Sequence, residues 1–265
     1  MSRVRIQFIG GGKMAEALVG GLIAADWARP EEITVVERYE SRRDELAERF
    51  PDIHLLTGPR ANTATLIAVK PQDIDAALAS LSGLGPRRVL SIAAGTTIAT
   101  LERALDDGTA VVRSMPNTPA LVGEAASAIA PGRHASDDDL AWGRSILESV
   151  GVVVTVDEAD LDAVTGLSGS GPAYVFAFAE ALAVAGERAG LDPGVAVLLA
   201  NQTIVGSAKL LADSDDDAAQ LRRNVTSPGG TTAEGLAVLE AEGFAELVAD
   251  AVAAATKRSR DLGSA

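Results

Sequence analysis

The stretch Arg5-Ile-Gln-Phe-Ile-Gly10-Gly-Gly12-Lys-Met-Ala15 decides the fold of this chain. Its apolar start predicts a short β-strand, and the glycines that follow at once open a helix with Leu18 and Leu22 on its inner face. A strand, the pattern G-x-G-x-x-A and a helix form the dinucleotide-binding fingerprint, with Ala15 in the third small position for close contact between helix and sheet. The sequence therefore predicts a Rossmann-type βαβ unit at the start of the chain.

The second predicted strand, Ile33 to Val36, ends in Glu37-Arg38. An acidic residue at this point binds the ribose hydroxyls of NAD, whereas an arginine binds the 2′-phosphate of NADP. This chain offers both, and Arg42 and Arg43 follow one turn later. Those two arginines also suit a solvated helix face, because Ser41 and Asp44 have the spacing of a capping box. The choice between NADPH and NADH stays open at this stage.

Further strands alternate with helices up to residue 157. The predicted strands are Thr65 to Val69, Arg88 to Ile92, Ala110 to Arg113 and Val152 to Val156. Small residues, prolines and Lys70 follow the carboxyl ends of these strands, where an open α/β sheet binds its ligand. We expect an α/β fold in which residues 1–157 form a doubly wound, dinucleotide-binding domain.

From Glu158 onward every segment predicts helix, so residues 158–265 are expected to form an all-helical domain. Its predicted helices are Glu158 to Gly166, Pro172 to Ala189, Pro193 to Ala212, Asp217 to Val225, Thr232 to Glu240 and Ala245 to Leu262. The run Ala173 to Ala185 is apolar on nearly all sides, and such a helix needs a larger core than this domain supplies. A second copy of the chain can supply that core, which predicts at least a homodimer.

Composition excludes several classes of function. The chain has 265 residues, no cysteine and a net charge of −14. Thiol nucleophiles, disulfides and thiolate metal sites are therefore excluded, and the two histidines, His54 and His134, predict loop or surface positions rather than a metal site. The acidic balance argues against nucleic acid or an anionic membrane as partner. No uninterrupted run approaches ~18 apolar residues and no leader segment precedes the first strand, so we expect a cytoplasmic protein.

The segment Val225-Thr-Ser-Pro-Gly-Gly-Thr-Thr-Ala-Glu234 predicts a tight turn that opens a helix. A helix start carries unpaired N–H groups and the positive end of the dipole, so it attracts anions. Gly229 and Gly230 lack a Cβ, which allows a small ligand to touch the backbone. Thr231 or Thr232 has two possible roles, as a helix cap or as a hydrogen-bond donor to a ligand.

The segment Gly166-Leu-Ser-Gly-Ser-Gly-Pro-Ala-Tyr-Val175 resembles a motif of the β-hydroxyacid dehydrogenases, G-x-x-G-x-G-x-x-x-K with asparagine four residues later. Val175 stands at the lysine position and Ala179 at the asparagine position. Without that ammonium group the site is poorly equipped to stabilise a developing alkoxide. A cyclic imine needs less help, because its nitrogen can be protonated before the hydride arrives. The residues therefore favour reduction of C=N.

Several further motifs make the chain resemble the pyrroline-5-carboxylate reductases nearly from end to end. They are Gly10-x-Gly-x-Met-Ala15, Ala68-Val-Lys-Pro71, Ser91-x-Ala-Ala-Gly95, Arg113-x-Met-Pro-Asn-Thr-Pro-Ala120, Val122-Gly-Glu124, Asp162-Ala-Val-Thr-x-Leu-Ser-Gly-Ser-Gly-Pro-Ala-Tyr174 and Asn224-Val-Thr-Ser-Pro-Gly-Gly-Thr-Thr232. The last two are the most specific. The resemblance implies reduction of 1-pyrroline-5-carboxylate to L-proline with NADPH or NADH, by interleaved dimers that often gather into decamers.

The resemblance also implies site residues. The substrate residues it implies are Glu158, Asn224, Ser227, Thr231 and Thr232. From the helix start itself we add Gly229 and Gly230 as substrate residues and expect Thr232 to be the catalytic hydrogen-bond donor. The cofactor residues are Ile9, Gly10, Gly11, Gly12, Lys13, Met14, Glu37, Arg38, Ala68, Val69, Lys70, Pro71, Ala93, Ala94, Gly95 and Asn117. No metal ligand is implied. A family asparagine that contacts adenosine has no secure counterpart, and Asn62 is the nearest stand-in.

Two other functions remain open from the sequence. One is a reductase of the same fold that acts on another imine or uses a deazaflavin cofactor, against which the Asn224–Thr232 loop argues. The other is a nucleotide-binding regulator without turnover.

Overall fold

The computed structural model describes residues 4–263. Contacts divide the chain into two compact units, one that runs to Ser170 and takes in the residues from Ala253 onward, and one from Gly171 to Val252. The boundary predicted after residue 157 stays a prediction, because the compact units divide at a different place.

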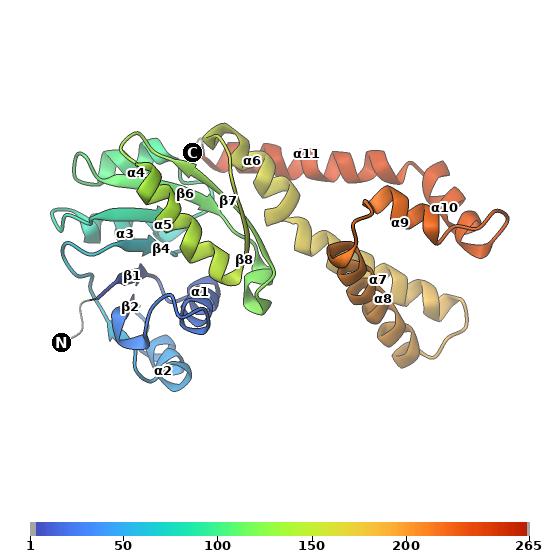
Figure 1. The fold of residues 1–265 in the computed structure, drawn as a ribbon, viewed down its shortest axis with the longest axis horizontal. Helices are drawn as coiled ribbons and strands as arrows, with labels where there is room; N and C mark the ends of the chain where they lie inside the picture. Colours follow the sequence, from blue (N-terminus) through green and yellow to red (C-terminus); the bar gives the residue numbers. More distant parts are fainter. Residues whose placement is uncertain (1–3, 264–265) are drawn as a thin grey trace. The chain divides into compact units, whose positions relative to one another are not determined.

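The first unit contains an eight-stranded sheet with the order β3-β2-β1-β4-β5-β6-β7-β8 (Figure 1). Its strands are β1 Ile6–Ile9, β2 Ile33–Val36, β3 His54–Leu56, β4 Thr65–Ile67, β5 Arg88–Ser91, β6 Ala110–Met115, β7 Ala125–Pro131 and β8 Gly151–Thr155. Neighbouring strands are parallel except β6 and β7, which are antiparallel. The predicted doubly wound sheet is therefore confirmed, with one antiparallel pair added.

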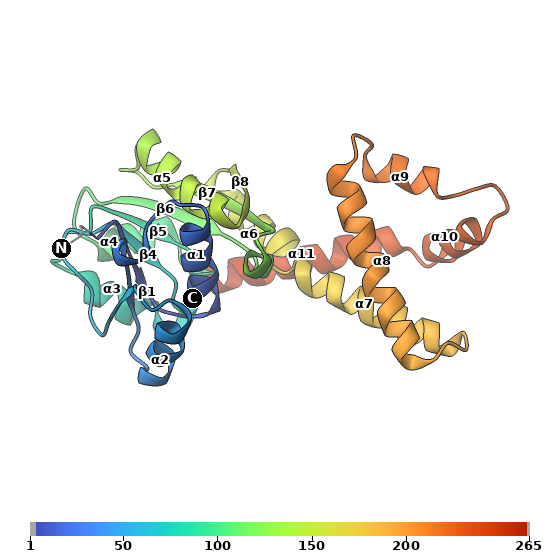
Figure 2. The same ribbon diagram turned by 60° about the horizontal axis from the view of Figure 1, so that its bottom comes forward.

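Helices cover both faces of this sheet (Figure 1, Figure 2). They are α1 Lys13–Ala24, α2 Glu40–Arg49, α3 Ile74–Leu81, α4 Ile98–Ala104, α5 Asp137–Leu147 and α6 Leu161–Val164. Successive strand residues point to opposite faces: Phe8 packs in the core under α1 and α5, and Ile9 in the core under α3 and α4. Leu66 and Ile67 divide in the same way. Because β1, β2 and β4 are buried on both faces, they are short, mainly apolar runs rather than alternating ones.

Two strands were not expected from the sequence, β3 and β7. His54, expected in a loop or on the surface, lies half-buried in β3. β7 pairs with β6 through Met115 and Ala128 and with β8 through Ala125 and Gly151. The expected end of β4 is also too late, since the strand stops at Ile67 and Val69 lies in the loop that follows.

Short turns join these elements. The 3₁₀ turns are Pro30–Glu32, Pro71–Asp73, Thr118–Val122, Glu148–Val150 and Glu158–Asp160, and Thr165–Gly169 is a π-helical turn. That π-turn forms the start of the Gly-Leu-Ser-Gly motif. Its side chains bond back to the preceding turn, since Thr165 Oγ1 donates to Leu161 O at 2.8 Å and Ser168 Oγ donates to Val164 O at 3.1 Å.

The second unit is helical, as predicted. Its helices are α7 Gly171–Arg188, α8 Pro193–Asp213, α9 Ala218–Asn224, α10 Thr231–Ala241 and the first half of α11 Phe244–Gly263. α7 and α8 pack side by side, which Figure 2 shows. Asp192 caps α8 by accepting hydrogen bonds from Gly194 N and Val195 N, and Pro193 fits the first helical position because its missing N–H has no partner there.

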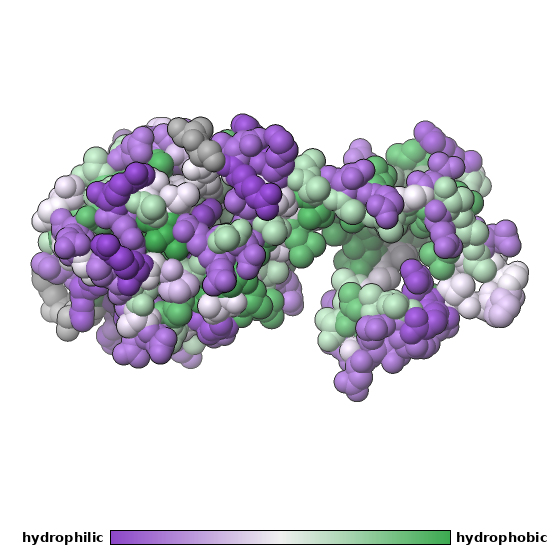
Figure 3. Space-filling view, turned by 90° about the horizontal axis from the view of Figure 1, so that it is seen from above, coloured by the Kyte–Doolittle hydropathy of each residue, from purple (hydrophilic) through white to green (hydrophobic). Residues whose placement is uncertain are grey.

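Large apolar side chains are exposed on these helices, and Figure 3 shows such residues among the polar ones. Phe176 on α7 is 67% exposed and Leu198 on α8 is 66% exposed. Two segments, Glu158–Arg188 and Pro193–Asp213, are long and apolar enough to cross a membrane by length and composition, although neither is an uninterrupted apolar run. Buried core helices of soluble proteins meet the same criterion, so these helices need an apolar cover of some kind.

Candidate active site

A pocket of about 550 Å³ opens at the carboxyl ends of β1, β2 and β4. The chain runs from β1 to β2 and β3 on one side of β1, and returns to β4 on the other side. Such a reversal of strand order is where open α/β sheets bind dinucleotides. The pocket is lined by Ile9, Gly10, Gly12, Val36, Glu37, Arg38, Tyr39, Arg42, Thr57, Ala68, Val69, Lys70, Gln72, Asp73, Ala76, Ala77 and Ser80.

The three positions after β1 are glycine for different structural reasons. Gly10 has φ +99°, and a Cβ there would lie 2.8 Å from Ala68 O. A Cβ on Gly11 would lie 2.8 Å from the side chain of Leu46. A Cβ on Gly12 would meet no described atom within 4 Å, so packing within the described part of the chain does not explain why this residue is glycine. The open space in front of Gly12 suits a ligand that approaches the backbone closely.

Helix α1 begins at this open space. Gly12 is its N-cap residue, and no side chain of residues 4–263 bonds to the first turn as a cap. The N–H groups of the first turn therefore lack a helical partner, and with the helix dipole they favour an anion such as a pyrophosphate. The residues present thus fit a dinucleotide.

Glu37 lies at the end of β2, where a ribose-binding acid is expected. Its side chain is buried, and Oε2 accepts a hydrogen bond from Gly11 N at 2.9 Å while Oε1 accepts one from Tyr39 N at 2.9 Å. The carboxylate therefore fixes the glycine loop against β2. Each oxygen keeps a lone pair for a further donor such as a ribose hydroxyl.

The three arginines that follow β2 have different partners. Arg42 donates to Gly11 O at 2.7 Å and pairs with Glu16 and Glu45. Arg43 donates to the carbonyl oxygens of Glu37 and Arg38, each at 2.9 Å. Arg38 is the one whose side chain is mostly exposed, at 59%, and its Nη2 lies 2.9 Å from Asp73 Oδ1. The hydrogen bond and the charge of Asp73 raise the pKa of Arg38 above its ordinary value.

The expected capping box at the start of α2 is not formed. The helix begins at Glu40, its N-cap residue is Tyr39, and no side-chain cap hydrogen bond is present among the described residues. Ser41 therefore lies inside the first turn rather than before it. Of the arginines of α2, Arg42 faces the pocket loop, because it lines the pocket and bonds to the backbone of the glycine turn.

The other predicted cofactor segments lie at the same edge of the sheet. Ala68 N donates to Ile9 O at 2.8 Å, which sets the loop Ala68 to Pro71 beside the glycine turn. Ala93, Ala94 and Gly95 follow β5, and Gly95 has φ +74°. A Cβ on Gly95 would lie 3.4 Å from Leu262 Cβ, so the end of α11 packs against this loop.

Some predicted cofactor residues have other contacts. Lys13 is mostly exposed and pairs with Glu16 at 3.2 Å. Met14 packs against the core beneath α1. Asn117 is buried, and its side-chain amide donates to Ser168 O at 3.0 Å and accepts from Ala126 N at 2.9 Å. Asn62 has φ +53° in a turn, where its N–H donates to Leu84 O at 2.8 Å. Their contacts with a cofactor stay predictions.

Glu158 belongs to the sheet-containing unit. Its Oε1 accepts hydrogen bonds from Ile98 N at 2.6 Å and from Arg113 Nη1 at 2.9 Å. The carboxylate thereby ties the start of α4, which follows the Ala93–Gly95 loop, to the buried Arg113 of β6. The predicted role of Glu158 in binding substrate stays a prediction, and these contacts show that it also orders its own unit.

The predicted substrate loop lies in the helical unit. Gly230 N donates to Ser227 O at 3.0 Å, and Gly229 has φ +68°. Proline followed by a glycine with positive φ is typical of a type II turn, so Ser227 to Gly230 forms that turn. The N–H of Gly230, which the sequence suggested for anion binding, is therefore used by the turn. A Cβ on Gly230 would lie 2.5 Å from Ser227 Oγ.

Helix α10 begins directly after this turn. Its N-cap is Gly230 and no side chain within residues 4–263 caps it, so neither Thr231 nor Thr232 serves as the cap. Both threonines are exposed in the first turn, where the N–H groups from Thr231 to Ala233 have no partner within the helix. The side chain of Asn224 is held by two hydrogen bonds: its Oδ1 accepts from Gln220 Nε2 at 2.7 Å, and its Nδ2 donates to Asp216 Oδ2 at 3.0 Å.

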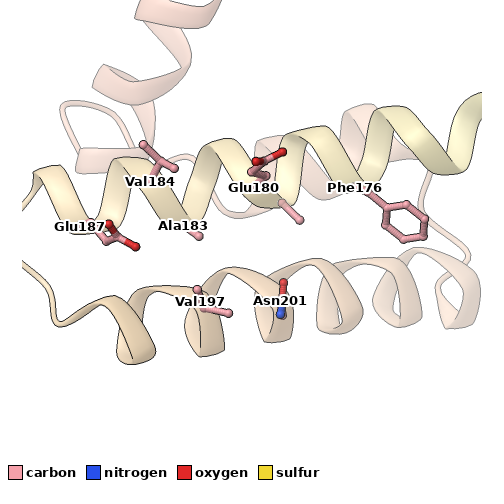
Figure 4. A pocket seen from close by; sticks show the side chains of 8 residues that line it. Phe176, Glu180, Ala183, Val184, Glu187, Val197 and Asn201 are labelled. Carbon is pink, nitrogen blue, oxygen red and sulfur yellow. The ribbon is translucent and has the colours of Figure 1, made fainter.

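A second hollow lies in the helical unit, between α7 and α8, with a volume of about 390 Å³ (Figure 4). Ala183 on α7 and Asn201 on α8 point into the space between the two helices. Glu180, Glu187, Phe176 and Val197 also line it. Apart from the amide of Asn201, the polar groups of this groove are the carboxylates of Glu180 and Glu187, which would repel a carboxylate substrate, so this groove is not the candidate site.

The pocket also contains Tyr39, Thr57, Gln72, Asp73 and Ser80, which were not predicted as site residues from the sequence. Gln72 and Asp73 directly follow the predicted segment Ala68 to Pro71, so a wider window after β4 would have found them. Thr57 follows β3, which was not predicted. Tyr39 was not predicted because Ser41 was expected to cap α2, whereas Tyr39 is its N-cap residue.

Two family models match the chain. Residues 158–262 match the one described as pyrroline-5-carboxylate reductase dimerisation. Residues 5–95 match the one described as NADP oxidoreductase, coenzyme F420-dependent.

Proteins similar over the whole length include the pyrroline-5-carboxylate reductase of Synechocystis, which is 45% identical over 98% of both chains. The pyrroline-5-carboxylate reductase of Methanosarcina acetivorans is 41% identical over 99% of both chains. Among solved structures, that of a pyrroline-5-carboxylate reductase from Coxiella burnetii superposes with a TM-score of 0.90 at 36% identity, over 98% of this chain and 99% of that one. The Plasmodium falciparum pyrroline carboxylate reductase with NADP bound has a TM-score of 0.84 at 30% identity, over 99% of both chains.

Proposed function

The chain belongs to the pyrroline-5-carboxylate reductase family, and from that premise we propose that it reduces 1-pyrroline-5-carboxylate to L-proline with NAD(P)H. The observation that carries this function is full-length similarity to reductases of that name, in a chain whose sheet has a dinucleotide pocket at its switch point. The fold excludes neither cofactor. The overall reaction adds one hydride and one proton across C=N.

The bound cofactor supplies the hydride for the imine carbon. The first turn of α1, opened by Gly12, would hold its pyrophosphate. Glu37 would accept a hydrogen bond from the adenosine ribose, and Arg38 would bind a 2′-phosphate where one is present. Ala68 to Pro71 and Ala93 to Gly95, at the ends of the neighbouring strands, would flank the nicotinamide half.

The start of α10 would hold the substrate carboxylate. Ser227 offers a hydroxyl, and the first-turn N–H groups from Thr231 onward offer unpaired donors at the positive end of the helix. The type II turn supports this proposal because it leaves these groups exposed. Thr232 would then align the imine nitrogen and pass on a proton from water, since a threonine hydroxyl is too weak an acid to supply it alone.

The two other functions, a deazaflavin-dependent reductase and a regulator without turnover, fit the observations less well. The model described as coenzyme F420-dependent matches residues 5–95 only, which is the nucleotide-binding part shared by many reductases. A regulator without turnover is disfavoured because the substrate-loop motif Asn224–Thr232 is intact.

One assay tests all three functions. Purified protein is mixed with 1-pyrroline-5-carboxylate and with NADPH, NADH or a reduced deazaflavin, and both cofactor oxidation and proline formation are measured. We expect one proline for each cofactor oxidised. Binding of NADPH without turnover would support the regulator, and activity with a reduced deazaflavin alone would support the other reductase.

The assembly and location complete the proposal. The chain carries a dimerisation domain, and we infer a homodimer, with a decamer as the larger assembly. The net charge of −14 supports a protein that binds neither nucleic acid nor an anionic membrane. A cytoplasmic location fits an enzyme that consumes NAD(P)H.

A further inference from the structure

Asp73 has an unusual side-chain position for its place in the chain. It ends the 3₁₀ turn Pro71–Asp73 and is the N-cap residue of α3. An aspartate at an N-cap usually accepts a hydrogen bond from the N–H groups of the first turn. In the described structure Asp73 makes no such bond. Its Oδ1 accepts instead from Arg38 Nη2 at 2.9 Å, across the mouth of the dinucleotide pocket that both residues line.

Arg38 is the arginine best placed to meet a 2′-phosphate. The guanidinium groups of Arg42 and Arg43 are bonded to backbone carbonyls of the glycine turn and of the end of β2. The guanidinium of Arg38 instead lies over the ring of Tyr39, 4.7 Å from its centroid, and pairs with Asp73. The guanidinium of Arg38 is thus already paired with a carboxylate, which a phosphate would have to replace or share.

We propose that Asp73 competes with the 2′-phosphate of NADPH for Arg38 and thereby weakens the binding of NADPH relative to that of NADH. The inference rests on the proposed function, because it takes the pocket to bind NAD(P)H. A 2′-phosphate carries up to two negative charges near neutral pH, so it must displace Asp73 from Arg38 or bind beside a like charge. The ribose of NADH, which carries no 2′-phosphate, would bind Glu37 and would not compete with Asp73 for Arg38.

The test compares Asp73→Asn with the matched control Asp75→Asn. The amide in Asp73→Asn keeps the shape of the side chain and removes its charge. Asp75 lies in the first turn of α3, is exposed and is not among the pocket residues, so its substitution removes the same charge nearby. Dissociation constants for NADP⁺ and NAD⁺ are measured by titration calorimetry, and unfolding midpoints show that each variant is folded.

We expect Asp73→Asn to tighten NADP⁺ binding about threefold to tenfold and to leave NAD⁺ within about twofold, because the competing charge is partly screened by solvent. Asp75→Asn should change neither by more than about twofold. In an Arg38→Ala background, which should itself weaken NADP⁺ binding and spare NAD⁺, Asp73→Asn should have little further effect. Weaker NADP⁺ binding by Asp73→Asn would mean that Asp73 orients Arg38, and would overturn the proposal.

Two further outcomes count against competition. An equal gain from Asp73→Asn with and without Arg38 would indicate simple repulsion of the phosphate. Equal gains from Asp73→Asn and Asp75→Asn would indicate a general effect of net charge. The proposed reductase function is contradicted by a different result, namely that the unmodified protein binds neither NADP⁺ nor NAD⁺. If it binds both and Asp73→Asn has no effect, only the competition at Arg38 is contradicted.

Discussion

Glu16 is a buried carboxylate in the first turn of α1, with only 4% of its side chain exposed. It pairs with Arg42, with Arg49 and, at 3.2 Å, with Lys13. Burial alone would raise the pKa of Glu16, but the hydrogen bonds and charges of Arg42 and Lys13 outweigh it and hold the pKa below 4.5. The charged form is therefore favoured in the folded protein.

This pairing predicts how stability depends on pH. Because the folded-state pKa of Glu16 is lowered, its contribution is fully present above the ordinary pKa of a glutamate and is lost as the pH falls through the lowered folded-state pKa. Glu16→Gln should lower the free energy of unfolding by roughly 1–2 kcal/mol near neutral pH and by less in acid. Urea unfolding at about pH 7 and about pH 4 measures both. An equal loss at the two pH values would contradict this account.

Thr232 provides the second test at the level of single residues. Thr232→Val keeps the shape of the side chain and removes its hydroxyl, so kcat should fall by ~10²-fold, the lower end of the range for a positioned donor. Thr232→Ser keeps a hydroxyl and should retain most of the activity. Steady-state kinetics of both variants measure the effect. Parent-like kcat for Thr232→Val, in a protein with unchanged unfolding, would remove Thr232 from the mechanism.

At the scale of the element, the turn from β1 to α1 separates a folding role from a binding role. Gly12 has φ −66° and ψ −178°, which alanine adopts easily, and its Cβ would enter open space. Gly10 has φ +99°, and its Cβ would lie 2.8 Å from Ala68 O. Substitution of Gly12 therefore tests ligand binding, and substitution of Gly10 tests folding.

Gly12→Ala should leave the free energy of unfolding unchanged within about 1 kcal/mol and weaken NADP⁺ binding at least about tenfold, because the methyl group lies where the pyrophosphate approaches. Gly10→Ala should lower the free energy of unfolding by roughly 1–3 kcal/mol. Urea unfolding without ligand and titration with NADP⁺ measure the two effects. Undiminished NADP⁺ binding by Gly12→Ala would show that the pyrophosphate lies elsewhere.

The strands also differ in how well the sequence predicts them. The strands β1 and β2 and the glycine turn were found because each has a strong local signal, in apolar β-branched residues and in glycine spacing. β7, Ala-Ala-Ser-Ala-Ile-Ala-Pro, has few such residues, and it is a strand because β6 and β8 pair with it. β3 has three residues and depends likewise on its pairing with β2.

The site residues that the sequence predicted best belong to short, local sequence motifs. The pocket contains the predicted glycines Gly10 and Gly12, Glu37, Arg38 and the loop from Ala68 to Lys70. The pair Arg38–Asp73 joins residues 35 positions apart, so no local pattern indicates it. The bonds of Asn117 and Glu158 were missed for the same reason, because they depend on neighbours supplied by the fold.

At the scale of the whole molecule, the exposed apolar surface of α7 and α8 predicts self-association. Leu198→Glu places a charge on a residue that is 66% exposed in the single chain. If a second copy covers this helix, the substitution should shift the protein toward monomer and lower its activity. Light scattering and sedimentation measure the assembly.

Ala79→Glu is the matched control for this variant. Ala79 is exposed on α3 of the sheet-containing unit, so the added charge should not change the assembly. A monodisperse and fully active monomer of the unmodified protein would overturn the inferred dimer. Identical assembly of the parent and Leu198→Glu would place the interface elsewhere.

The end of α11 has a consequence for how the chain folds during synthesis. Residues from Ala253 onward belong to the same compact unit as the sheet. Ser259 Oγ donates to Asp162 Oδ1 at 2.6 Å, and Leu262 packs against the loop at Gly95. The ribosome makes these residues after the sheet and the helical unit, so the nucleotide-binding unit stays unfinished until they have left the exit tunnel. A nascent chain can thus form its sheet early and yet order the loop after β5 only once the end of α11 has been made and can pack against it.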